Sequence, residues 1–192
     1  MNTNLAGLKI AILATNGVEQ AELEEPRKAL DEAGATTVLA SPDGGTIQAM
    51  KHDDKSTTFE ADKKISDLDP DDFDAVLLPG GALNADALRV DEDAQKFVQA
   101  IDAAQKPLAV ICHGPWLLID ARLVKGRALT SYHTIETDLE NAGANWSDEK
   151  VVRDRNWVSS RKPDDIPAFN KEFIALLSER NAKPRAAAAS RS

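Results

Sequence analysis

Cysteine is nearly absent from this sequence, which contains a single one, Cys112, among 192 residues, together with only three histidines. A lone thiol cannot form an internal disulfide, and one cysteine with scattered histidines does not have the spacing of zinc ligands. No apolar stretch is long enough to cross a bilayer, and residues 1–7 lack the basic end and apolar core of a secretory signal. We therefore expect a cytoplasmic protein without a structural metal.

Positive charge is also in short supply, because 23 Lys and Arg residues face 32 Asp and Glu residues, for a net charge of -9. Nucleic acids and anionic membranes both bind basic surfaces, so neither is an expected partner. A hydrophobic content of 42% is ordinary for a globular protein. We expect one domain over residues 1–179 and a disordered tail over 180–192, where an alanine run replaces large apolar residues.

Short apolar runs alternate with segments of helical periodicity along the whole chain. Buried strands are predicted at 9–13, 36–40, 74–78, 108–111 and 157–160, and shorter strands at 46–50, 57–59, 128–131, 145–146 and 151–152. Helices are predicted at 84–90, 92–104, 135–142 and 166–177. Such alternation predicts a mostly parallel sheet with helices on both faces, that is, a flavodoxin-like three-layer α/β sandwich.

The only cysteine lies where a strand is predicted to turn into a helix, in the run Ile-Cys-His-Gly-Pro over residues 111–115. A thiol at a helix N-terminus is expected to have a lowered pKa, because unpaired amide groups favour the thiolate. A free cysteine is just as often a small core residue. The neighbouring histidine, glycine and proline, and the long amphipathic helix pattern that follows, favour a reactive Cys112.

Glu22 is predicted at the same edge of the sheet, after the first strand. Because Pro26 is tolerated only in the first turn of a helix, the helix is expected to begin near Glu24 or Glu25, with Glu22 in the approach to it. Carboxylates at such a position usually interact favourably with the helix dipole, and this remains the better interpretation for Glu19, Glu24 and Glu25.

Three motifs in order resemble one known family: residues 78–81 (Leu-Pro-Gly-Gly), 111–115 (Ile-Cys-His-Gly-Pro) and 130–132 (Thr-Ser-Tyr). Together they resemble the PfpI-type intracellular proteases of the class I glutamine amidotransferase-like superfamily, relatives of the parkinsonism-associated deglycase. The resemblance covers about residues 8–177. It implies a cofactor-independent cysteine enzyme, either a hydrolase or protease or a glyoxalase or deglycase, that acts on a small carbonyl substrate or a peptide in stress defence.

The resemblance also implies a role for each site residue. Cys112 would be the nucleophile, His113 the base, and Glu22 a protonated acid that hydrogen-bonds to the sulfur. The backbone N–H groups of Gly81 and His113 would hold an oxyanion, and Gly80 and Trp116 would border the pocket. Without the family, a Gly-Gly pair is only a turn, and a tryptophan is more often part of the core.

Asp86 occupies the position of an acid that, in the resembling family, reaches the cysteine and histidine of a neighbouring subunit. A homo-oligomer, at least a dimer, is therefore implied. The sequence departs from the family here, because residues 81–86 are about one residue longer than usual and aspartate is shorter than glutamate. His133 follows the same strand end as Tyr132 and is interpreted as a surface residue within reach of the site.

Two other functions fit parts of the same pattern. Cys112 could serve as a redox sensor or a chaperone switch that is oxidised without turnover, because the same activated thiol serves both purposes. An amidotransferase partner subunit is disfavoured, because glutaminases of this superfamily take their histidine and acid from a late His-x-Glu that residues 159–163 do not contain.

Overall fold

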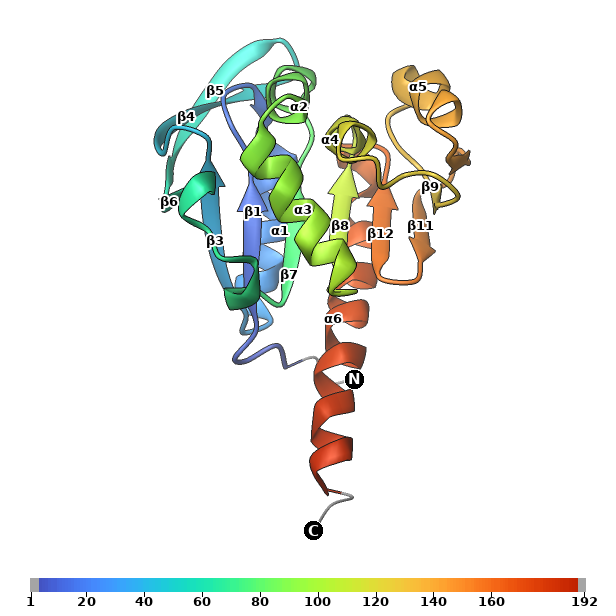
Figure 1. Ribbon diagram of the computed structural model, residues 1–192. Helices are drawn as coiled ribbons and strands as arrows, with labels where there is room; N and C mark the ends of the chain where they lie inside the picture. Colours follow the sequence, from blue (N-terminus) through green and yellow to red (C-terminus); the bar gives the residue numbers. More distant parts are fainter. Residues whose placement is uncertain (1–3, 190–192) are drawn as a thin grey trace.

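A seven-stranded, mostly parallel sheet forms the centre of the protein (Figure 1). The computed structural model describes residues 4–189, with side chains up to residue 181. The strand order is β11-β12-β8-β7-β1-β3-β6, and only β11 runs antiparallel to its neighbour. The strands are β1 (Lys9–Leu13), β3 (Thr36–Ser41), β6 (Lys63–Lys64), β7 (Ala75–Leu78), β8 (Leu108–Ile111), β11 (Val151–Asp154) and β12 (Trp157–Ser160).

Helices cover both faces of this sheet, because the central strands are apolar on both sides. Along β1, Ile10 and Ile12 pack against α1 (Gln20–Glu32) and α6 (Ile166–Ala189), whereas Ala11 and Leu13 belong to the core on the opposite face. That opposite face is covered by α2 (Ala82–Arg89), α3 (Glu92–Ala103), α4 (Pro115–Asp120) and α5 (Glu136–Asn141). The predicted three-layer sandwich is confirmed.

Two small sheets lie beside the main one. In the first, β2 (Val18–Glu19) pairs with β4 (Gly45–Lys51), which forms a hairpin with β5 (Asp54–Ala61). In the second, β9 (Ala128–Leu129) pairs with β10 (Asn145–Trp146). Single 3-10 turns complete the described chain: η1 (Ile65–Asp67), η2 (Pro70–Asp72), η3 (His133–Ile135) and η4 (Pro163–Asp165).

The bounds of α1 and α6 differ from those predicted. Helix α1 begins at Gln20, so Glu22 lies in its first turn, and Pro26 lies inside the helix. The proline forgoes one backbone hydrogen bond, and the burial of Leu23, Pro26 and Leu30 stabilises the helix across it. Helix α6 runs past the predicted end at residue 177 to Ala189. The last residues of the predicted tail, 190–192, lie outside the described residues, and the single domain over 1–179 stays a prediction.

Helix α4 is only six residues long, although the sequence predicts a long helix after the cysteine. It ends because Arg122 adopts a left-handed backbone conformation with φ of 61°. The N–H of Leu123 then donates to the carbonyl of Leu118 at 3.0 Å, which closes the last turn. No helix within residues 4–189 is both long and apolar enough to span a membrane.

One partly buried carboxylate connects the amino ends of β8 and β12. Asp102, near the end of α3, accepts hydrogen bonds from Arg127 at 2.5 Å, Trp157 at 2.7 Å and Asn156 at 3.1 Å, all on the same oxygen, Oδ1. The guanidinium of Arg127 also lies over the ring of Trp157, 4.2 Å from its centroid. We call these four residues the Asp102 cluster; it anchors the edge of the sheet opposite to the predicted site.

Candidate active site

Segments from four parts of the chain meet at the carboxyl ends of β7 and β8. Helix α1 contributes Glu22, the turn after β7 contributes Gly80 and Gly81, and the turn after β8 contributes Cys112 and His113. The segment after β9 reaches the same place, because the N–H of Tyr132 donates to the carbonyl of Cys112 at 3.0 Å. This is the sheet edge at which open α/β folds place their ligands.

Cys112 adopts a backbone conformation that side chains rarely take. Its φ is 62°, in the left-handed region, and it lies directly between the last residue of β8 and the turn that opens α4. Its own N–H donates to the carbonyl of Ser160 at 3.1 Å, which fixes the turn to β12. Strained residues of this kind, held by surrounding hydrogen bonds, cluster at functional sites. The residue is 8% exposed, and it lines a cavity.

Glu22 is fully buried next to this cysteine. Its Oε2 accepts a hydrogen bond from the N–H of Gly80 at 3.0 Å, whereas Oε1 is covered and has no hydrogen-bond partner of its own within the described structure. Burial raises the pKa of Glu22 from 4.5 to about 8, despite the opposing effect of its contact with Cys112. The carboxyl group is therefore mainly protonated at neutral pH.

The thiol of Cys112 behaves differently from the expectation based on its place at a helix terminus. Burial raises its pKa, and the negative charge of Glu22 raises it further, whereas the backbone N–H groups of Gly81 and His113 lower it. Burial destabilises the thiolate more than the two N–H groups stabilise it. The prediction of a lowered thiol pKa is wrong, because it did not include the depth at which the turn is buried.

His113 directs one ring nitrogen at the sulfur. Its Nδ1 lies 3.2 Å from Sγ of Cys112, and its Nε2 lies 3.1 Å from Oγ1 of Thr134. Burial lowers the pKa of His113 below 6.5, and the nearby His133 adds to this effect. The imidazole is therefore neutral at pH 7 and able to accept a proton.

The two glycines after β7 have no room for a side chain. A Cβ on Gly80 would collide with the Glu22 carboxylate and lie 2.5 Å from Cβ of Cys112. Gly81 has a φ of 90°, and a Cβ there would meet the backbone of Gly17. Only glycine lets this turn approach the acid and the thiol closely enough for the N–H of Gly80 to reach Glu22 and that of Gly81 to reach the sulfur.

A cavity of about 770 Å³ opens over the sulfur. Its lining residues are Gly17, Glu19, Glu22, Met50, His52, Asp53, Gly81, Ala82, Leu83, Cys112, His113, Tyr132, Lys162, Pro163 and Asp164. Gly80 and Trp116, both expected at the pocket, are not among them. Gly80 is buried beside Glu22, and Trp116 packs against the ring of His113, 5.3 Å between centroids, with its Nε1 donating to Asp138 at 2.8 Å.

Asp86 lies on the exposed side of α2. Within this chain, the group that lies at the second nitrogen of His113 is Thr134. A part played by Asp86 in another subunit's site stays a prediction.

Sequence reasoning missed two polar residues that shape this site. Asn84 is fully buried, and its side chain bonds the N–H of Thr15 and the carbonyls of Pro79 and Gly80, so that it fixes the glycine turn. Thr134 approaches His113 as described above. Asn84 falls at the start of a predicted helix and Thr134 directly before another, and the only sequence signal is a polar side chain close to the predicted end of a strand.

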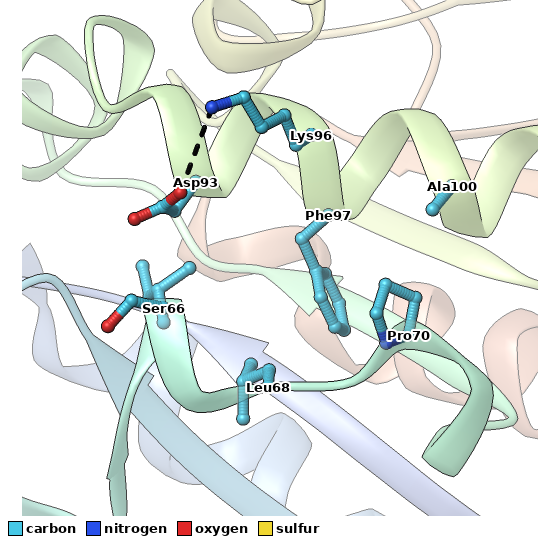
Figure 2. A pocket seen from close by; sticks show the side chains of 8 residues that line it. Ser66, Leu68, Pro70, Asp93, Lys96, Phe97 and Ala100 are labelled. Carbon is cyan, nitrogen blue, oxygen red and sulfur yellow. Dashed lines mark ion pairs between the residues drawn. The ribbon is translucent and has the colours of Figure 1, made fainter.

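A second cavity, of about 310 Å³, lies between η1, η2 and α3 (Figure 2). Phe97 and Pro70 face each other across it, and Lys96 and Asp93 of α3 form an ion pair of 4.0 Å at its side. Neither cysteine nor histidine lines it. Among the described residues, no group of three or more His, Cys, Asp and Glu side chains is arranged to hold a metal ion. The cavity over Cys112 is the candidate active site, because Glu22, Cys112 and His113 all line it.

A family model and several relatives match most of the chain. The family model described as DJ-1/PfpI matches residues 8–176. The chain belongs to the DJ-1/PfpI family. The match includes β1, the glycine turn, the Cys112 turn and the first part of α6, so that the whole candidate site lies inside the family domain.

Relatives in the DJ-1/PfpI family carry several functional names. The chain is 46% identical to "Putative cysteine protease YraA" of Bacillus subtilis, over 88% of this chain and 98% of the relative. It is 44% identical to General stress protein 18 of the same organism, over 89% and 98%. It is 42% identical to Deglycase TK1284 of Thermococcus kodakarensis, over 88% and 99%.

Solved structures support the same fold. The crystal structure of Drosophila melanogaster DJ-1beta superposes with a TM-score of 0.82 and covers 89% of this chain and 90% of its own. At 24% identity, this similarity concerns the fold alone.

Proposed function

We propose that this member of the DJ-1/PfpI family is a cofactor-independent cysteine enzyme that acts on electrophilic carbonyl groups. The observation that carries the proposal is the contact of 3.2 Å between Sγ of Cys112 and Nδ1 of a neutral His113, at the floor of an open cavity. A nucleophile within hydrogen-bond distance of a base that is itself oriented by a third group is the arrangement of covalent catalysis.

The shifted pKa values determine the order of the proton movements. Because the thiol pKa is raised and the imidazole pKa is lowered, the proton leaves Sγ during the attack rather than before it. The S–H bond breaks as the N–H bond at Nδ1 forms, Sγ bonds to the carbonyl carbon, and the carbonyl electron pair moves to oxygen. The backbone N–H groups of Gly81 and His113, which point at the sulfur in the resting site, stabilise that oxyanion.

Glu22 takes the role of a protonated acid beside the sulfur. With a pKa of about 8, it is mainly neutral at pH 7, and its covered Oε1 has no other partner in the described structure. A neutral carboxyl group donates a hydrogen bond to a thiolate, whereas an ionised one repels it. Glu22 therefore favours the charge that develops on Cys112 during the reaction.

The substrate is a small carbonyl compound or adduct, or a peptide. A cavity of about 770 Å³ has room for either, and the relatives named as a deglycase and a cysteine protease represent the two choices. The relative named as a general stress protein supports a role in stress defence.

A homo-oligomer is part of the proposal, with Asp86 reaching the site of a second subunit. Two large apolar side chains support it, because Leu83 on α2 is 65% exposed and Val90 at its end is 73% exposed. A fully active monomer in sedimentation and activity measurements on the same sample would remove Asp86 from the site.

The decisive experiment compares the wild type with Cys112→Ala on methylglyoxal, on a methylglyoxal-modified amino acid and on a fluorogenic peptide. We expect Cys112→Ala to lose at least about 10³-fold in kcat/KM on the true substrate, as expected for removal of a nucleophile. Equal turnover by the two proteins would refute the proposal. Exposed Thr137→Val, on α5, is a control that leaves Cys112 and His113 unchanged.

The alternative of a redox sensor has weaker support in this site. Sensor cysteines combine a low pKa with exposure, whereas Cys112 is 8% exposed and its pKa is raised. Stable sulfinic acid at Cys112 after mild peroxide, found by mass spectrometry in a protein without Cys112-dependent turnover, would favour the sensor.

A further inference from the structure

The charged side chains around the active-site cavity are mostly acidic. Apart from the buried acid described above, three carboxylates and one ammonium group line it: Glu19, Asp53, Asp164 and Lys162. Nζ of Lys162 lies 3.3 Å from Oδ2 of Asp164, so these two charges offset each other. Within residues 4–181, neither Glu19 nor Asp53 forms an ion pair. Two negative charges at the cavity are therefore not balanced by a cation of the described chain.

Glu19 is fixed in position by the hairpin beside it. It is the last residue of β2, and its Oε2 accepts a hydrogen bond from the N–H of His52, at 3.0 Å, in the turn between β4 and β5. The negative charge of Glu19 contributes to the raised pKa of Glu22. Glu19 therefore lies close enough to the reactive thiol to act on the group that contacts it.

Asp53 lies in the same turn between β4 and β5, directly after His52. Its carboxylate is exposed and accepts no hydrogen bond from the described part of the chain. The hydrogen bond between Glu19 and His52 joins the two elements that carry these acids, so both lie on one side of the cavity. We call Glu19 and Asp53 the acidic wall.

The acidic lining continues beyond the active-site cavity. A neighbouring cavity of about 300 Å³ shares three lining residues with it, Glu19 among them. Two more carboxylates, Glu24 and Glu25 of α1, line this second cavity together with one cation, Lys51. A substrate longer than a small dicarbonyl compound therefore has further carboxylates beside it as it extends away from the sulfur.

Apolar side chains line the same cavity and suit the aliphatic part of a lysine or arginine. Met50 of β4 lies shortly before Asp53 in the chain, and Leu83 of α2 is 65% exposed. Lysine and arginine place their methylene groups on apolar surface while the charged end stays in a polar environment. A small dicarbonyl compound such as methylglyoxal has neither the methylene groups for this surface nor the charge for the acidic wall.

We propose that Glu19 and Asp53 are specificity-determining residues that select carbonyl substrates carrying a positive charge, such as a carbonyl group on or next to a lysine or arginine residue. The inference rests on the proposed function, in which Cys112 attacks that carbonyl. The acidic wall attracts a cation and repels an anion, so a cationic substrate is favoured over a neutral one and an anionic keto acid is disfavoured.

The first test uses fluorogenic peptides that differ only in the residue before the scissile bond, which is arginine, its neutral isostere citrulline, or glutamate. One charge at about 6 Å from another in a solvated cavity changes an equilibrium constant by about 3- to 10-fold. With two unbalanced acids, we expect kcat/KM of the wild type for the arginine peptide to exceed that for the citrulline peptide by at least about 10-fold, and the glutamate peptide to be the poorest substrate.

A second set of probes replaces the peptide by a small dicarbonyl compound. Phenylglyoxals with a para trimethylammonium group, with no charged group and with a para carboxylate should follow the same order of kcat/KM. Selection by charge among the peptides alone identifies a peptide carbonyl as the source of the substrate, and selection among the phenylglyoxals alone identifies a dicarbonyl compound or adduct. Either result supports the acidic wall.

Two variants remove one charge each, Asp53→Asn and Glu19→Gln, and the oxygen of the glutamine amide can still accept from His52. Each should lower the ratio of kcat/KM for the cationic over the neutral probe by about 3-fold, and the double variant should remove the preference. The ratio cancels any effect of Glu19 on Glu22 that both probes share. Asp71→Asn is the matched control, because it removes an exposed charge at the amino end of β7, the opposite edge of the sheet.

Ionic strength gives a readout that a structural role would not change. Raising the salt concentration from about 0.02 M to about 0.5 M should reduce the cationic preference of the wild type and leave the double variant unaffected, because salt screens charge interactions. A wild type that turns over cationic and neutral probes equally in both sets, or a double variant that keeps the wild-type preference, would overturn the inference.

The outcomes also distinguish this inference from the function on which it rests. If no probe is turned over in a Cys112-dependent way, the proposed enzyme fails, and calorimetric binding of the arginine and citrulline peptides to Cys112→Ala decides about the acidic wall. Tighter binding of the arginine peptide that is lost with Glu19→Gln and Asp53→Asn supports it, and equal binding refutes it. If Cys112 is required but charge has no effect on turnover, only the acidic wall fails.

Discussion

Replacing the buried acid by its amide, Glu22→Gln, should remove a loss of folding stability that the wild type undergoes as the pH rises. The pKa of Glu22 is raised in the folded protein, so the folded state holds the proton over a pH range in which the unfolded chain has lost it. Folding stability therefore falls with increasing pH between the two values. Glutamine cannot ionise, and its amide group can still accept from Gly80 and donate toward Cys112.

The size of this effect follows from the shift. The pKa rises from 4.5 to about 8, and with about 1.4 kcal/mol for each unit, full ionisation of Glu22 lowers the free energy of unfolding by about 5 kcal/mol. Below pH 4.5 this stability is fully present, and about 3 kcal/mol of it is lost by pH 7. Relative to the wild type, the free energy of unfolding of Glu22→Gln should therefore rise by about 3 kcal/mol between pH 4.5 and pH 7, and by about 5 kcal/mol once Glu22 is fully ionised.

Urea unfolding at a series of pH values from 4 to 8 measures the difference directly. Glu25→Gln is the matched control, because Glu25 is an exposed glutamate on the same helix, and its curve should run parallel to that of the wild type. A wild type and a Glu22→Gln variant that also run parallel across this range would show that Glu22 is ionised at neutral pH, and the role given to it here would be wrong.

Three further predictions concern the same site. Alkylation of Cys112 by iodoacetamide should rise with pH later than that of a free thiol, and Glu22→Gln should move this profile to lower pH by removing the negative charge. The acid limb of kcat/KM should lie below pH 6.5, because burial lowers the pKa of the base His113; a limb above pH 7 would exclude this base. Gly80→Ala should cost about 1–3 kcal/mol in urea unfolding and abolish turnover, because its Cβ overlaps the Glu22 carboxylate; wild-type values for both would contradict this packing.

Much of the fold could be predicted from the sequence, because period and composition report burial along each element. The run at 108–111 predicts β8, and the apolar stripe of 92–104 predicts α3. The start of α1 could not be placed in this way, because Pro26 is accommodated by packing against the sheet rather than by local preference. Nor could the end of α4, which depends on the left-handed conformation of Arg122, a residue type that gives no signal for it.

The site was predictable in its members more than in its chemistry. The motif around Cys112 and the acid before Pro26 indicate which groups meet, and the structure brings Glu22, Gly81 and His113 to the sulfur. The direction of the thiol pKa was not predictable, because it depends on how completely distant segments cover the turn. Thr134 escaped notice because a single hydroxyl in a short turn is a common feature of any surface.

The Asp102 cluster lies at one end of the sheet, and the candidate active site lies at the other. Three donors converge on one oxygen where β8 and β12 begin, far along those strands from the turn that carries Cys112. Loops at the carboxyl ends of the strands can thus be exchanged or lengthened without disturbing the Asp102 cluster, which holds β8 and β12 in register. A protein engineer who wanted a new substrate range would diversify residues 50–53 and 162–164, which line the cavity, and keep the Asp102 cluster unchanged.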